Sequence, residues 1–90
     1  MIRDGVPYFA FRSNLEFEKK TYHLSIILFY NNKANRKEYE VTSNEFSGPA
    51  KRLVHTTLNE SPEKEWMDID NHDDSLLVQE IGAVIYRHNV

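Results

Sequence analysis

The segment TYHLSIILFY, residues 21–30, constrains the fold more than any other part of this chain. Large apolar side chains recur at every second position, whereas Thr21, His23 and Ser25 fall between them. Side chains on a β-strand alternate between its two faces, so this pattern predicts a strand with one apolar and one more polar face. The expected apolar face consists of Tyr22, Leu24, Ile26, Leu28 and Tyr30.

The residues that follow predict a turn and a second strand. NNKAN, residues 31–35, is typical of a turn because asparagine tolerates positive φ and hydrogen-bonds to its own backbone. RKEYEVT, residues 36–42, alternates again. We expect Tyr39 and Val41 to point inward and Glu38, Glu40 and Thr42 to point outward. The two strands therefore predict a β-hairpin with a polar, basic tip. A shorter strand is predicted before them, at Tyr8–Arg12.

The period changes after the hairpin. Apolar residues between Phe46 and Leu58 recur at intervals of three and four, which is one stripe of a helix. Pro49 would disrupt a helix interior but is harmless in a first turn. We therefore expect a helix with Ser47 as its N-cap, ending near Asn59.

The last part of the chain, Ser75–Val90, is rich in β-branched residues and predicts a strand with a bulge at Gly82. The expected element order is therefore β-β-β-α-β. This is a single α+β domain over residues 1–90, with one helix packed on a largely antiparallel sheet.

Composition limits the classes of protein to which the chain can belong. Ninety residues correspond to one domain, and 40% hydrophobic residues argue against a disordered chain. The absence of cysteine excludes disulfides and thiolate metal sites, which fits a reducing compartment. The longest apolar run, Ile26–Tyr30, is too short to span a bilayer. We expect a soluble cytoplasmic protein with no membrane partner.

Negative charge is concentrated in one segment. Residues 60–74 contain seven carboxylates and one lysine, together with Trp66, the only tryptophan of the chain. Carboxylates around an indole suit recognition of a basic surface, with Trp66 as the buried anchor. The alternative interpretation is a solvated connection in which Trp66 folds back onto the core. The partner-binding residues expected from this segment and from the hairpin tip are Glu63, Glu65, Trp66, Asp68, Asp70, Lys33, Arg36 and Lys37.

These features predict a non-enzymatic protein-binding module. We expect a small regulator or inhibitor, of the type found among phages and mobile elements, that occludes a basic site on a partner protein. The edge strand Tyr8–Arg12 could also pair with its twin, so the chain is expected to be a monomer or a homodimer.

Metal chemistry is not expected. Asp68, Asp70 and His72 resemble the start of a calcium loop, but the sixth and twelfth positions hold Asp73 and Gln79 where glycine and glutamate are required. No cofactor motif is present, because the three glycines are isolated.

Two alternative functions remain open. The basic hairpin tip, together with Tyr8, Phe9 and Phe11, could bind single-stranded RNA or DNA. The groups Tyr86, Arg87 and His88 could support metal-independent RNA cleavage, as in small toxin-type ribonucleases.

Overall fold

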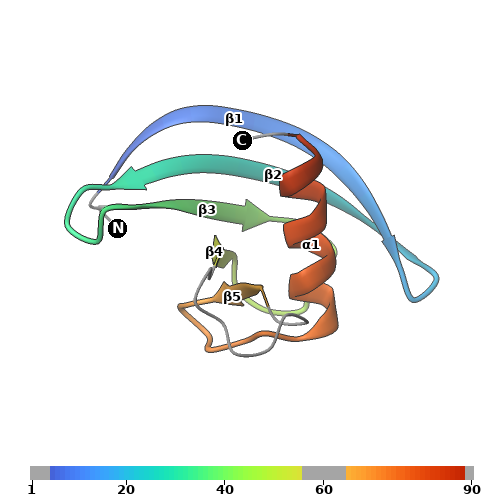
Figure 1. Cartoon of the computed structure of the whole chain (residues 1–90). Coiled ribbons are helices and arrows are strands. Elements are labelled where there is room, and N and C mark those ends of the chain that lie inside the picture. Colours follow the sequence, from blue (N-terminus) through green and yellow to red (C-terminus); the bar gives the residue numbers. More distant parts are fainter. Residues whose placement is uncertain (1–4, 56–64, 89–90) are drawn as a thin grey trace.

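The computed structural model describes residues 5–55 and 65–88, with backbone only for 5–8. Within these residues, five strands precede a single helix (Figure 1). The elements are β1 (Gly5–Phe17), β2 (Lys20–Asn31), β3 (Arg36–Thr42), β4 (Lys51–His55), β5 (Trp66–Asp68) and α1 (Leu76–Arg87). The strands form one antiparallel sheet in the order β1-β2-β3-β4-β5. The α+β class is therefore confirmed.

The predicted hairpin is present in full. β2 buries alternate side chains, and Leu24, Ile26 and Leu28 are each no more than 2% exposed. Residues 32–35 form the turn, in which Asn35 has a φ of 54°. β3 follows with Tyr39 and Val41 buried, as expected. The strand predicted at residues 8–12 is also present, but β1 is longer and reaches Phe17.

The helix predicted from Ser47 is wrong, because residues 51–55 form strand β4 between β3 and β5. Leu53 pairs with Tyr39 of β3 on one side and with Asp68 of β5 on the other. These long-range backbone pairs override the helical spacing of the apolar residues. Pro49 precedes the strand and donates no ladder hydrogen bond. Residues 56–59 of the predicted helix lie outside the described residues.

The strand predicted at residues 75–90 is also wrong, because residues 76–87 form helix α1. Its buried residues include Val78, Ile81 and Ile85, spaced by three and four positions, which is the period of a helix. The β-branched content favoured a strand, but tertiary packing of one helical face outweighs this weak preference. The predicted order β-β-β-α-β is therefore replaced by β-β-β-β-β-α.

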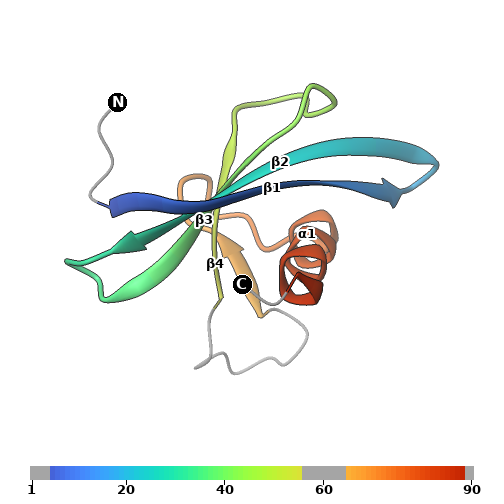
Figure 2. The same cartoon turned by 90° about the horizontal axis from the view of Figure 1, so that it is seen from above.

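The core lies between α1 and one face of the sheet. Figure 2 shows α1 on one side of the strands, and Ile81 and Ile85 are fully buried there together with Ile26 and Leu53. We call the opposite side the outer face. No helix within the described residues is long and apolar enough to cross a membrane.

Candidate binding surfaces

Asp68, predicted to contact a partner, is fully buried within the domain. Its Oδ1 accepts a hydrogen bond from the backbone N–H of Arg52 at 3.1 Å, and its Oδ2 accepts one from Nδ2 of Asn71 at 2.7 Å. The carboxylate therefore ties β5 to β4 and to the turn after β5. A buried and hydrogen-bonded carboxylate is not accessible to a partner, so the prediction of an accessible Asp68 is wrong.

Trp66 is also part of the core rather than an exposed anchor. It is 6% exposed, and its ring lies 5.6 Å from that of Tyr39 in an edge-on arrangement. On α1, Gln79 accepts a hydrogen bond from the backbone N–H of Trp66 at 3.0 Å and donates one to its carbonyl at 2.7 Å. The indole folds back and holds β5 against the helix, as the alternative interpretation of this segment expected.

Asp70 and Arg36 are joined by a charge network on the outer face. Arg52 lies 2.6 Å from Asp70 and 3.5 Å from Glu38, and Arg36 lies 3.0 Å from Glu38. Glu38 points away from the helix-covered face, as expected, but its side chain is buried under these arginines and is only 3% exposed. Burial would raise the pKa of Glu38, but hydrogen bonds from Asn31 and Arg36 and the charge of Arg52 outweigh it, so the pKa is lowered.

The other predicted contact residues are spread over two regions. Lys33 lies in the exposed hairpin turn. Lys37 is exposed at the start of β3, and Glu65 is exposed just before β5. Glu63 lies outside the described residues.

Two neighbouring hollows bring several of these residues together. Their volumes are about 530 and 300 Å³, and His55, Trp66 and Tyr86 line both. We call them together the helix-end groove, whose remaining lining residues are Arg36, Lys37, Tyr39, Glu65, Gln79, Ala83 and Arg87.

The helix-end groove combines an exposed aromatic ring with charges of both signs. Tyr86 is 73% exposed although it is a large side chain, and Arg87 and Lys37 are also exposed. His55 Nε2 lies 3.6 Å from a carboxylate oxygen of Glu65. Sequence reasoning could not assemble this site. Its residues come from β3, β4, β5, α1 and the residue before β5, and of these four elements only β3 was assigned its actual structure.

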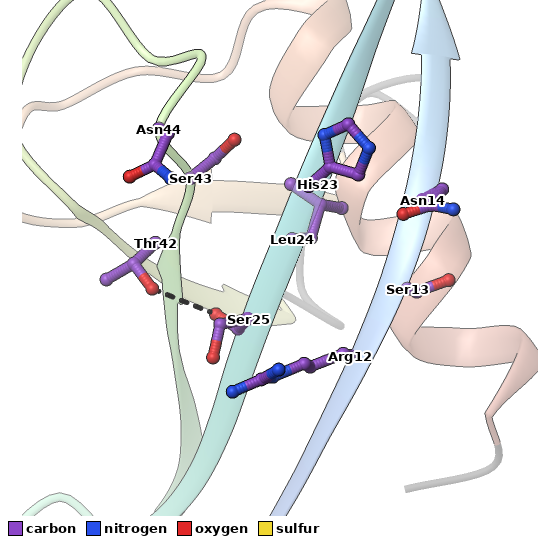
Figure 3. A pocket seen from close by; sticks show the side chains of 9 residues that line it. All are labelled: Arg12, Ser13, Asn14, His23, Leu24, Ser25, Thr42, Ser43 and Asn44. Atoms are coloured by element: carbon purple, nitrogen blue, oxygen red, sulfur yellow. Dashed lines mark hydrogen bonds between the residues drawn. The ribbon is translucent and has the colours of Figure 1, made fainter.

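A second depression of about 500 Å³ lies on the outer face (Figure 3). Arg12 and Asn14 of β1, His23 and Ser25 of β2, and Thr42 of β3 extend from neighbouring strands into the same region. The lining also includes Ser13, Leu24, Ser43 and Asn44, so it consists largely of hydrogen-bonding groups and contains no aromatic carbocycle. This surface suits polar contacts but has no exposed large apolar side chain that could act as an anchor.

Glu45 fixes one side of this depression. Its Oε1 accepts hydrogen bonds from the backbone N–H of His23 and from the hydroxyl of Ser43, both at 2.8 Å, and its Oε2 lies 3.3 Å from Nδ1 of His23. The backbone hydrogen bond from His23, followed by that from Ser43, lowers the pKa of Glu45 to about 2. The imidazole is therefore oriented by a carboxylate that stays ionised at all but strongly acidic pH.

The groups considered for RNA cleavage do not share one site, although all three lie at the C-terminal end of α1. Tyr86 and Arg87 line the helix-end groove, whereas the ring of His88 stacks on Phe11 of β1 with centroids 4.0 Å apart. Of the aromatic residues considered for nucleic acid binding, Phe9 is 45% exposed and Phe11 is half-buried. Within residues 5–55 and 65–88, no three His, Asp or Glu side chains are grouped as metal ligands would be.

Comparisons of this chain with models of protein families, with curated proteins and with solved structures each find no match. The arguments for a function therefore come from the geometry of the two surfaces.

Proposed function

We propose that this protein is a non-enzymatic binding module that holds a segment of a partner protein in the helix-end groove. The observation that carries the proposal is the exposure of Tyr86, 73%, beside the cationic side chains of Lys37 and Arg87. Tyrosine and arginine are enriched among the residues that dominate binding energy in protein interfaces. A large exposed aromatic ring within a hollow can become buried when a partner fills that hollow.

The charge of the groove indicates the chemistry of the partner. Arg36, Lys37 and Arg87 contribute three cations, Arg36 being paired with Glu38, and Glu65 contributes one carboxylate next to His55. A partner segment with acidic residues around an apolar side chain would complement this arrangement. This differs from the partner with a basic surface expected from the acidic segment, because Asp68 and Trp66 are buried in the core.

The same observations favour a protein partner over a nucleic acid. Single-stranded nucleic acids bind to several stacked aromatic rings along a positively charged track. Tyr86 is the only strongly exposed aromatic ring of the described groove residues, and Glu65 lies within the groove. The chain also has a net charge of −3, which opposes tight binding to phosphates.

The test compares variants that change the groove without changing the core. Tyr86→Ala and Arg87→Ala remove exposed groups, and Glu80→Ala on the exposed side of the same helix is the matched control. The tagged wild type and each variant are used for affinity capture from the native host, with nuclease treatment and identification of the retained proteins. We expect a protein that is retained by the wild type and by Glu80→Ala but is lost with both groove variants.

Other outcomes would contradict the proposal. Identical retention by wild type and groove variants would exclude the groove as the contact surface. Loss of the captured material on nuclease treatment would indicate a nucleic acid ligand. Degradation of RNA by the purified protein, abolished by His55→Ala, would indicate an enzyme that uses the pair of His55 and Glu65.

A further inference from the structure

The two edges of the sheet differ in how their backbone groups are covered. At the β5 edge, Gln79 pairs with both backbone groups of Trp66. The backbone of Asp68 exchanges two hydrogen bonds with Asp73, at 2.8 and 3.1 Å. This edge is therefore closed by the chain itself. At the other edge, β2 is the only strand within the described residues that pairs with β1.

The β1–β2 turn shows which backbone groups of β1 point away from β2. The turn consists of Glu18 and Lys19, with φ of 51° and 64°, so Phe17 and Lys20 form the hydrogen-bonded pair that closes it. Hydrogen-bonded and non-bonded pairs alternate along an antiparallel ladder. The N–H and C=O groups that point outward therefore belong to every second residue before Phe17, namely Glu16, Asn14, Arg12 and Ala10.

The side chains along this edge have a self-complementary pattern. Arg12, Asn14 and Glu16 are exposed and lie on the outer face. The cation and the carboxylate are each two positions along the strand from Asn14. On the opposite face, Phe11 and Phe17 are half-buried against the core and lie three positions on either side of Asn14. Edge strands are normally protected by charged side chains, by proline or by a bulge, and the two charges here have opposite signs. The irregularity in β1 falls between Pro7 and Phe9, so it leaves residues 10–16 regular.

We propose that β1 pairs with β1 of a second copy in an antiparallel arrangement centred on Asn14. In this register Arg12 lies opposite the partner subunit's Glu16, and Glu16 lies opposite the partner subunit's Arg12. The outward backbone groups of residues 12, 14 and 16 then meet the same groups of the second copy, so both ladders continue across the dimer. Phe11 lies beside the partner subunit's Phe17 on the helix-covered side. The two five-stranded sheets become one continuous ten-stranded sheet.

Charge selects this register over its neighbours. Hydrogen bonding allows only shifts by two residues, because the outward groups occur at every second position. A shift by two residues places Arg12 or Glu16 opposite the partner subunit's Asn14, so both pairs of Arg12 with Glu16 are lost. A shift by four residues brings like charges together, because Arg12 then lies opposite the partner subunit's Arg12, or Glu16 opposite the partner subunit's Glu16. Cross-strand pairs of like charge are unfavourable, whereas the register centred on Asn14 forms two opposite-charge pairs.

The experiment measures the dimer dissociation constant of the full chain by sedimentation over a concentration series. Arg12→Glu and Glu16→Arg each place like charges opposite one another twice per dimer, so each should raise the dissociation constant by roughly tenfold or more. The double variant Arg12→Glu with Glu16→Arg reverses both charges and should return it to near the wild-type value. Lys33→Glu, at the other end of β2, is the charge-change control and should have no effect.

Hydrogen exchange of the wild type gives an independent measurement. The amide protons of Arg12, Asn14 and Glu16 should exchange more slowly as protein concentration rises, while those of Ser13 and Leu15 should not change. A protein that stays monomeric up to its solubility limit would overturn the proposal. So would a dimer that is insensitive to the single charge reversals, or a double variant that does not recover dimerisation. If a single variant does not fold, the double variant and the exchange pattern decide the outcome.

This dimer is independent of the partner-binding function proposed above. The residues that line the helix-end groove come from β3, β4, β5, α1 and the residue before β5, and none lies on β1. Tyr86→Ala should leave dimerisation unchanged, and Arg12→Glu should leave partner capture through the groove unchanged. The two proposals can therefore fail separately.

Discussion

Gly82 of α1 lies directly against the indole of Trp66 in β5, with no room for a methyl group between them. A Cβ atom added at Gly82 would fall 2.2 Å from Cγ of Trp66, closer than side-chain atoms approach one another. The glycine therefore allows the helix to pack closely on the one tryptophan of the chain. The same glycine, in a segment predicted to be a strand, was interpreted as a bulge.

Gly82→Ala should destabilise the protein although alanine is the better helix former. The gain in helix propensity is about 1 kcal/mol, whereas overpacking against Trp66 costs about 1–3 kcal/mol and can cost more at such a short distance. We expect a net loss of about 1 kcal/mol or more, which lowers the Tm by roughly 4–8 °C per kcal/mol in a domain of this size. Thermal unfolding followed by circular dichroism measures this change. In a Trp66→Ala background the same substitution should become stabilising, and a stabilising effect in the wild type would contradict the packing argument.

Gln79→Met should lower the free energy of unfolding by about 1–3 kcal/mol. The side-chain amide of Gln79 hydrogen-bonds both backbone groups of Trp66, and methionine of similar length leaves these groups unsatisfied. Glu80→Met on the exposed side of α1 is the matched control and should change stability by less than about 0.5 kcal/mol. Denaturant unfolding gives both values, and equal effects of the two substitutions would show that the amide does not stabilise β5.

Asp68→Ala should destabilise the fold, whereas Asp70→Ala should have a small effect. Asp68 is buried, and its loss leaves the backbone N–H of Arg52 and the amide of Asn71 without their acceptor, a cost of about 2–3 kcal/mol. Asp70 forms a partly exposed ion pair with Arg52, which contributes at most about 1 kcal/mol. Denaturant unfolding of both variants separates a structural carboxylate from a surface one. An Asp68→Ala variant with an unchanged free energy of unfolding would contradict the structural role that we assign to this carboxylate.

Glu45 should contribute to acid sensitivity between about pH 5 and pH 2. Its pKa is about 2 in the folded protein against an ordinary value of 4.5, so the unfolded chain binds more protons in this range. The contribution of Glu45 to stability therefore rises with pH from about 2 to 5. It is fully present above the pKa that Glu45 has in the unfolded chain, and it is lost as the pH falls towards the pKa in the folded protein. In Glu45→Gln the dependence of unfolding free energy on pH should be shallower over this range, with Glu80→Gln on the exposed side of α1 as the control for an exposed carboxyl. Parallel curves of unfolding free energy against pH for Glu45→Gln and the wild type would contradict the lowered pKa of Glu45.

The acidic segment shows how far a local pattern determines burial. Sequence alone could identify Trp66 as an amphipathic residue in a charged segment, and folding back onto the core was one of the interpretations it allowed. It could not show that Asp68 would be buried and Asp70 exposed, because both are aspartates in the same segment. The difference depends on the position of Arg52 on β4 and of Asn71 after β5, which together supply the hydrogen bonds that a buried carboxylate needs.

The sequence by itself determined the hairpin of residues 20–42, since alternation of apolar side chains and an asparagine-rich turn act between residues close together in the chain. Only the tertiary structure decided that residues 51–55 are a strand and residues 76–87 a helix. In both segments the local preferences conflicted, because Leu53 and Val54 fit either period and β-branched Val78, Ile81 and Ile85 lie at helical spacing. The conflict is resolved by pairing of β4 with β3 and β5, and by packing of α1 on the sheet face that these strands complete. Those interactions join residues far apart in the chain, and their energy exceeds the differences in local propensity.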